Sequence, residues 1–316
     1  MTNLLKAELN RWFSRRLFWA MLLAAVGVSL LVMLGMSQAY RPQSPAEIAQ
    51  AERDYADAQQ QAEQDRKDCI DSGQSAQDCD TWTPQRSDFV YEPPTYASLV
   101  GNGAQTATMI AQLAALVAAA SYMGAEFKSG SLATWLTYVP RRAPVFASKA
   151  VVGVIGSAVL GAVVHAIVQI GMVAYAWHWL GASGLQGAAA EWGIVGRGLI
   201  VTAGAGLLGY CLATLFGSTI APLGALLGIV VAQWMAGIVT LLVGEMPWLI
   251  QLMPDNNLNA FVNGQFETLF VVRGTAGEEV EQVIRIGLGQ ASLYLGCLLI
   301  VAVASALWSF TRREVR

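Results

Sequence analysis

Five stretches of the sequence contain no aspartate, glutamate, lysine or arginine, and their lengths constrain the fold more than any other feature. They are residues 17–40, 93–125, 150–190, 198–244 and 286–311. A helix needs about 20 mostly apolar residues to cross the hydrocarbon core of a membrane, and every stretch is long enough for one. Because 55% of the chain is hydrophobic and only 13% is charged, we expect a polytopic membrane protein rather than a soluble domain.

The fourth stretch is long enough to hold two helices. A break is expected near Gly217-Ser218-Thr219, and Pro222 suits the first turn of the helix that follows. The sequence therefore predicts an all-α membrane protein whose six transmembrane helices cover residues 17–39, 98–123, 150–177, 197–217, 221–243 and 288–310. The first apolar run is too long for a signal peptide and has no convincing cleavage site, so we expect it to remain as a helix.

The basic residues predict the orientation. Eleven of the 19 lysines and arginines fall in residues 1–16, 124–149 and 311–316, together with only three acidic residues. The positive-inside rule places these segments in the cytoplasm. Both termini are then cytoplasmic, and the extracellular segments are residues 40–97, 178–196 and 244–287. The net charge of −3 gives no basis for binding nucleic acid.

The segment before the first span has an amphipathic pattern. Helical spacing places Leu5, Leu9, Trp12 and Phe13 on one face, with the basic residues largely elsewhere. Such a helix can lie in the cytoplasmic membrane interface before the chain enters the bilayer. The alternative is a simple positive flank to the first span.

Residues 40–97 are expected to form a helical extracellular insertion. Ser44-Pro45-Ala46-Glu47 reads as a capping box before a helix over residues 48–67. A thin apolar seam along this helix, from Ile48 to Ala62, indicates packing against the rest of the insertion, with a partner-binding coiled coil as the alternative.

Topology restricts the cysteines. Cys211 and Cys297 lie in predicted spans, so only Cys69 and Cys79 share an oxidising compartment. We predict a disulfide between them, worth roughly 2–3 kcal/mol for so short a loop. Metal binding is the lesser alternative, because no histidine lies nearby.

The loop of residues 124–149 carries the most information about function. Ser131 can cap a short amphipathic helix that includes Leu132 and Trp135 and ends at Pro140. A helix of this kind between two spans can transmit a push from a cytoplasmic partner. An ordinary basic loop that only sets the topology explains the same residues about equally well.

Residues 244–287 suggest a re-entrant or interfacial half-helix. Met246 to Met253 is apolar, Pro254 to Asn257 is expected to turn the chain, and Glu278, Glu279 and Glu281 are expected to start a helix that continues into the last span. Irregular backbone at this depth is tolerated only where protein buries it or it lines a cavity.

Several motifs fail on closer inspection. Gly204 to Gly209 matches the nucleotide-binding pattern GxGxxG but lies inside an apolar span, so we expect these glycines to permit close helix packing instead. Gly224 and Gly228 form a GxxxG pair, which suits packing in a helix bundle or at a dimer seam. The chain has only two histidines, and its spans have no acidic residues well inside, which disfavours a metal site or a proton relay. His165 is expected to be a hydrogen-bonded packing residue.

Energy for transport would have to come from another subunit. No lysine follows a glycine, so the chain has no P-loop, and we expect neither an enzyme activity nor a cofactor in this chain. Ion-gradient coupling usually needs ionisable groups at the midplane. The spans instead offer uncharged polar residues that could line a pathway: Asn102, Gln105, Gln112, Gln169 and Gln233.

The order of these features resembles the small six-helix bacterial permeases of the ABC type-2 exporter family. The resemblance rests on Arg15-Arg16 before the first span, the Pro254 turn, the ending Phe310 to Val315, and the loop pattern from Glu126 to Ser131 with Pro140-Arg141-Arg142 and Lys149. It implies that ATPase coupling involves Glu126, Phe127, Lys128, Leu132, Trp135, Arg141 and Arg142.

The resemblance also implies the partners. Two permease subunits, identical or different, would surround a pathway in the bacterial plasma membrane, and separate cytoplasmic ATPase subunits would bind ATP and Mg. The substrate would be amphipathic, lipid-like, a drug or a peptide. Two alternatives stay open: a non-transporting subunit of an ABC-like signalling complex, and a toxin-immunity membrane protein. The acidic insertion of residues 40–97 is larger than such permeases usually carry.

Overall fold

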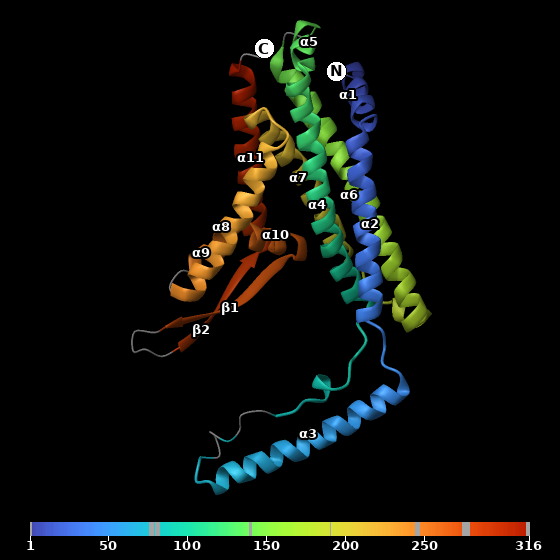
Figure 1. Ribbon diagram of the computed structural model, residues 1–316, viewed down its shortest axis with the longest axis vertical. Coiled ribbons are helices and arrows are strands. Elements are labelled where there is room, and N and C mark those ends of the chain that lie inside the picture. The colour runs from blue at the N-terminus through green and yellow to red at the C-terminus, as the bar shows by residue number, and fades with distance from the viewer. Residues whose placement is uncertain are drawn as a thin grey trace.

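The computed structural model describes residues 2–75, 79, 83–138, 141–189, 191–243, 247–273 and 279–313, and it is mostly helical (Figure 1). The longer helices are α1 (Thr2–Phe13), α2 (Arg16–Ala39), α3 (Pro45–Asp71), α4 (Tyr96–Ser129), α6 (Arg142–Leu180), α7 (Trp192–Phe216), α8 (Ala221–Val243) and α11 (Leu288–Arg312). The shorter elements are η1 (Arg86–Asp88), α5 (Ser131–Tyr138), η2 (Ala182–Leu185), α9 (Pro247–Leu252), α10 (Pro254–Asn263), β1 (Gln265–Arg273) and β2 (Glu279–Gly287).

Six helices among the described residues are long and apolar enough to cross a membrane, which confirms the prediction of a multi-pass membrane protein. They are α2, α4, α6, α7, α8 and α11. Each contains the span predicted for it, within a few residues at its ends. The largest difference is in α4 and α6, which continue past the apolar stretches to Ser129 and back to Arg142. Charged residues at these two helix ends are therefore helical, which the sequence boundaries did not anticipate.

Helices α4, α6 and α7 pack against one another and form the centre of the bundle, whereas α2, α8 and α11 are mostly exposed. Small residues permit the close approach, as the GxGxxG stretch predicted. A Cβ atom on Gly206 would collide with Ser157 of α6, and one on Gly209 would collide with the backbone carbonyl of Leu116 in α4. Added Cβ atoms on Gly224 and Gly228 would meet no described atom within 4 Å. Those two glycines do not serve helix packing inside the described chain.

Both termini lie at one end of the bundle, which we call the terminal end; α1 and α5 lie there too (Figure 1). Helix α3 lies beyond the opposite end, below the bundle in the same view. The membrane-spanning helices thus separate α1 and α5 at the terminal end from α3 at the opposite end. The basic segments and the acidic insertion are at opposite ends of the molecule.

The insertion begins as predicted. The hydroxyl of Ser44 accepts from the backbone N–H of Glu47, and the Glu47 carboxylate accepts from the backbone N–H of Ser44 at 2.6 Å, so the capping box is complete. The seam packs locally, because Ala51 is buried and the Tyr55 ring lies 5.8 Å from that of Phe89.

The predicted disulfide is present. Cys69 and Cys79 are joined with a Cα–Cα distance of 5.7 Å, which is ordinary for a disulfide. The bridge ties the end of α3 to the segment that leads back toward the bundle.

The prediction for residues 244–287 was wrong in two respects. Pro254 begins helix α10 at its first position, where a missing N–H costs nothing, instead of opening a turn. Glu279 and Glu281 lie in strand β2, paired antiparallel with β1, instead of starting a helix, so the fold is not purely α. Met246 and Glu278 lie outside the described residues.

The hairpin has a clear physical cause that the sequence pattern concealed. β-branched residues, which favour the extended backbone, occur in both strands. Glu267 and Arg285 are directly opposite in the register and form an ion pair of 3.0 Å, a pairing that stabilises antiparallel strands. Ile284 and Ile286 are buried, and Ile286 packs in a small core with Ala260 of α10.

Candidate functional site

The turn between α4 and α5 brings the predicted loop residues back onto the bundle. Gly130 ends α4 in the left-handed conformation, with φ of 67°, which glycine adopts without strain. Helix α5 therefore starts at once, at Ser131. Its hydroxyl donates to the carboxylate of Glu126 at 2.9 Å. Ser131 was predicted to cap α5, but its side chain instead ties the start of α5 to the last turns of α4.

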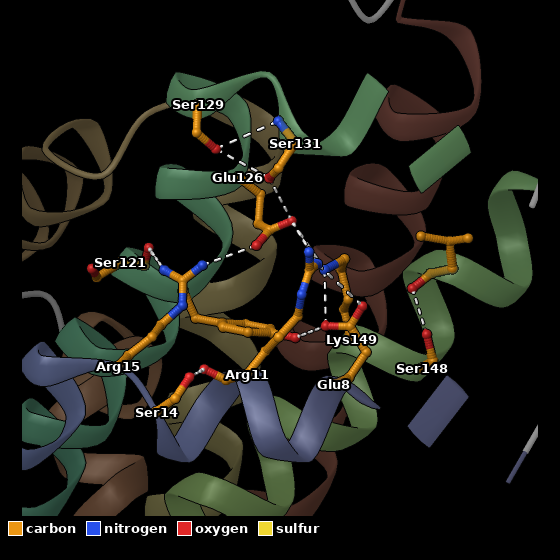
Figure 2. A network of polar contacts seen from close by, with 12 residues as sticks. Glu8, Arg11, Ser14, Arg15, Ser121, Glu126, Ser129, Ser131, Ser148 and Lys149 are labelled. Atoms are coloured by element: carbon orange, nitrogen blue, oxygen red, sulfur yellow. Dashed lines mark hydrogen bonds and ion pairs between the residues drawn. The ribbon is translucent and has the colours of Figure 1, made fainter. Parts of the chain in front are cut away.

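Glu126 is the centre of a polar network at the terminal end (Figure 2). Its side chain is only 5% exposed, and its Oε1 accepts from Arg15 Nη2 at 2.9 Å. Its Oε2 lies 3.3 Å from Lys149 Nζ and 3.6 Å from Arg11 Nη1. One carboxylate thus connects α4 with α5, with the start of α6, and with α1 and the start of α2.

Glu8 forms the second half of the network. It is 1% exposed and accepts from Lys149 Nζ at 3.0 Å and from the hydroxyl of Tyr122. Lys149, which is completely buried, therefore lies between two carboxylates from different helices. We refer to Glu8, Arg11, Arg15, Tyr122, Glu126, Ser131 and Lys149 as the buried network.

Aromatic rings enclose the cations of the network. The Arg11 guanidinium lies 4.8 Å from the ring centre of Trp135, and that of Arg15 lies 4.9 Å from the ring of Tyr122. Both distances suit cation–π attraction. Trp135 therefore connects α5 to α1, and Leu132 on the same helix is completely buried. The apolar face predicted for α5 is packed against the bundle.

The charges explain why the network is stable as a unit and sensitive to damage. Two carboxylates face three cations, so each acid has at least one cationic partner. Removing charges from water is costly, and the attraction offsets that cost only when every group is paired. Loss of Lys149 would take the nearest cation from Glu8, and loss of either carboxylate would take a partner from the buried ammonium.

A second set of contacts ties the same end together through helix C-termini. Arg142 Nη1 donates to the carbonyl oxygens of Phe310, Thr311 and Arg313 at the end of α11. Arg313 donates to the carbonyls of Thr214 and Leu215 at the end of α7. Cations suit these positions because the last carbonyls of a helix are unpaired and carry partial negative charge.

The predicted coupling residues therefore separate into buried and exposed groups. Glu126, Leu132, Trp135 and Arg142 hold elements together inside the terminal end, and Phe127 lies under the Arg313 guanidinium at 5.6 Å. Only Lys128 and Arg141 are exposed. Pro140 lies outside the described residues.

Sequence reasoning missed Glu8 and Lys149 as members of the site. Two signals could have found them: Glu8 is the single acid in a basic segment, and Lys149 directly precedes a charge-free span. Tyr122 gave no signal, because a tyrosine near the end of a span is ordinary.

The uncharged polar residues predicted to line a pathway do not gather in one place. Gln105 donates to Asn263 of α10 at 2.5 Å, and Gln233 donates to Asp255 at 2.8 Å. Gln169 is buried and donates to the carbonyl of Val100 at 3.2 Å. Asn102 is exposed, and Gln112 is half-buried. Three of the five thus have structural partners on other helices.

The described residues contain no group of three or more histidine, cysteine or acidic side chains placed to hold a metal ion. The site is thus an arrangement of ion pairs and rings that can hold or transmit the position of α5. No protein-family model matches the chain, and no curated protein sequence matches it.

Proposed function

We propose that this chain is the permease subunit of an ATP-driven exporter for an amphipathic substrate, with the energy supplied by separate ATPase subunits at the terminal end. The observation that carries the proposal is the attachment of α5. This short helix between two spans is joined through Ser131 to Glu126, and Glu126 is paired with Lys149 on α6. A force on α5 would therefore act directly on two central helices.

The orientation in this proposal follows the basic residues. The terminal end carries α1, the α4–α6 connection and the C-terminus, which hold most of the chain's basic residues and few acids. The positive-inside rule makes this the cytoplasmic end. Helix α3 with its disulfide then lies outside, where oxidation is possible.

In this proposal, exposed and buried residues have different roles in coupling the ATPase to the spans. Lys128 and Arg141 are exposed on either side of α5 and would contact the ATPase. The buried network would carry the displacement into α1 and α6, because Lys149 on α6 forms buried ion pairs with Glu8 on α1 and with Glu126 on α4. Two such chains, the same or different, would enclose the pathway.

Site-specific crosslinking tests the proposal. A photoreactive amino acid replaces Thr134, an exposed residue of α5, and in a matched chain it replaces Gln60, an exposed residue of α3. We expect the Thr134 probe, activated in native membranes, to capture a protein with a P-loop sequence, and the Gln60 probe to capture none. Capture of no P-loop protein at Thr134, or equal capture from both positions, contradicts the proposal.

A second candidate function is favoured by α3. This 27-residue helix lies clear of the bundle beyond the opposite end (Figure 1), and its surface is mostly polar and exposed. Such an element suits a subunit that binds another protein and signals without transport. The Gln60 probe distinguishes the two, because a signalling subunit would crosslink there to a non-ATPase protein.

A further inference from the structure

Helix α8 is buried less than any other span. Only 6% of the residues in its most apolar window are buried inside the protein, compared with 61%, 50% and 44% for α4, α6 and α7. Among the described elements, it packs appreciably only against its chain neighbours α7 and α9. In Figure 1, α8 leaves the terminal end and diverges from α4 along its length. Few contacts along α8 therefore fix its angle to the bundle.

The turn between α7 and α8, residues 217–220, is held much more closely. It starts at Gly217, whose φ of 63° is left-handed. Helix α4 approaches the turn at Gly124, where an added Cβ atom would lie 2.6 Å from the backbone nitrogen of Thr219 and 2.8 Å from its Cα. A side chain at position 124 would displace this backbone, so glycine lets α4 lie directly against the turn.

Arg313 holds the turn from the side of α11. Its guanidinium donates to the carbonyls of Thr214 and Leu215, in the last turn of α7, at 3.2 Å and 2.8 Å. A Cβ atom on Gly217 would lie 2.7 Å from Arg313 Nη1, so the guanidinium lies directly against the start of the turn. We refer to Gly124, Gly217 and Arg313 as the turn clamp.

Arg142 positions Arg313 in the turn clamp. It donates to three backbone carbonyls at the end of α11, including that of Arg313 itself, and so fixes the backbone from which the Arg313 side chain extends. Arg142 is the first residue of α6 and follows α5 after a short connection. A displacement of α5 would therefore reach the turn clamp through Arg142. It would also reach the clamp through α4, where Glu126 is two residues from Gly124.

The other half of α8 has a single polar tie. Gln233 donates to Asp255 of α10 at 2.8 Å, and in the described part of the chain this is the one side-chain hydrogen bond from α8 to another element. A single hydrogen bond contributes little net stability. This tie can therefore open without disturbing the rest of the fold.

We infer that α8 is a hinged helix that pivots about residues 217–220, and that the turn clamp sets its angle to α4. Gly217 can absorb the change in backbone direction, because glycine adopts positive and negative φ with similar ease. A small displacement at the clamp would be enlarged along α8 toward the opposite end. The pivot does not require an ATPase, so it is tested separately from the proposed function.

Distances between pairs of spin labels on the full chain in lipid nanodiscs test the pivot. One pair replaces Met109 on α4 and Trp234 on α8, and the control pair replaces Met109 and Ile170 on α6; all three side chains are exposed. The chain carries Cys297→Ser, because that free cysteine is exposed, and is diluted with unlabelled chain. Trp234 is about 20 Å along α8 from the turn, so a pivot of about 10° moves it by about 3–4 Å. We expect the α4–α8 distance distribution to be wider than the α4–α6 one by at least about 3 Å.

Variants of the turn clamp test what sets the angle. Arg313→Gln should widen the α4–α8 distribution further, by at least about 3 Å, whereas Arg312→Gln, at the exposed neighbouring arginine, should leave it unchanged. Gly124→Ala should shift its mean, because the added Cβ displaces the turn, and Gly228→Ala, which has free space, should not. An unchanged α4–α6 distribution confirms that each variant is folded. An α4–α8 distribution as narrow as the α4–α6 one, or one that Arg313→Gln leaves unchanged, overturns the inference.

Discussion

Lys149 on α6 and Glu8 on α1 form a completely buried ion pair, with 3.0 Å between the ammonium nitrogen and the carboxylate oxygen. The same ammonium reaches Glu126 on α4 at 3.3 Å. Since Ser131 of α5 donates to Glu126, a single lysine holds three helices and, through one more bond, a fourth. The helices at the terminal end are thus held together by charges that lie inside the protein.

The first prediction concerns this lysine. Lys149→Met should lower the free energy of unfolding by about 3–5 kcal/mol, because two buried carboxylates lose their shared cation. Lys67→Met is the matched control: its partner Glu63 is exposed, and an exposed pair is worth about 0–1 kcal/mol. Unfolding in mixed micelles with increasing SDS measures both. Similar losses in the two variants would show that burial of the network does not matter.

The second prediction compares two glycines of the spans. Gly209→Ala should destabilise by about 1–3 kcal/mol, since its Cβ would collide with backbone of α4 that cannot move aside cheaply. Gly228→Ala has free space and should change stability by less than about 1 kcal/mol, in the stabilising direction. The same SDS unfolding series measures both. Equal destabilisation by the two would contradict the packing described for α4 and α7.

The third prediction is a pH dependence at the start of α3. The backbone N–H and side chain of Ser44, helped by Arg41, hold the pKa of Glu47 below its ordinary value of 4.5. A lowered pKa in the folded state means that the stabilisation is complete above pH 4.5 and is lost as pH falls through the folded value.

Hydrogen exchange at the first turn of α3, corrected for the intrinsic pH dependence of exchange, measures this effect. Protection should be constant above pH 4.5 and should decline below it. Glu47→Gln should show weaker protection with no decline over that range. A decline of the same size in Glu47→Gln would assign the effect to another group.

The fourth prediction concerns the orientation. With a membrane-impermeant maleimide added to intact cells, Gln60→Cys in α3 should react at once, whereas Thr134→Cys in α5 should react only after the membrane is permeabilised. The unmodified chain, whose free cysteines Cys211 and Cys297 lie in spans, gives the background. The reverse pattern would place the terminal end outside the cell.

Charge and hydropathy were sufficient to predict the six spans, because a membrane requires apolar length and leaves few alternatives. The capping box at Ser44 and the Cys69–Cys79 bridge were also predictable, since each depends on residues close in the sequence. Features set by local chemistry or by the solvent were therefore predicted from the sequence.

Pairings between distant residues were not predictable. Glu8 and Lys149 are 141 positions apart, and nothing near either residue identifies the other. The β1–β2 hairpin was missed for a related reason: the acidic Glu279 and Glu281 suggested a helix start, but cross-strand pairing with β1 determined their conformation. The partners of a residue and the conformation of a segment depend on what that segment packs against. The pattern of residues in a single sequence does not contain this information.

The most direct test of the proposed function uses the ATPase captured at α5, reconstituted in liposomes with and without this chain. The rate at which that ATPase hydrolyses ATP is measured. The account predicts that the chain stimulates hydrolysis and that Glu126→Ala abolishes most of the stimulation, because α5 is released from α4 and α6. Arg53→Ala, an exposed substitution on α3, should leave it intact. Stimulation unchanged by Glu126→Ala, or no assembled complex with an ATPase, would contradict the account.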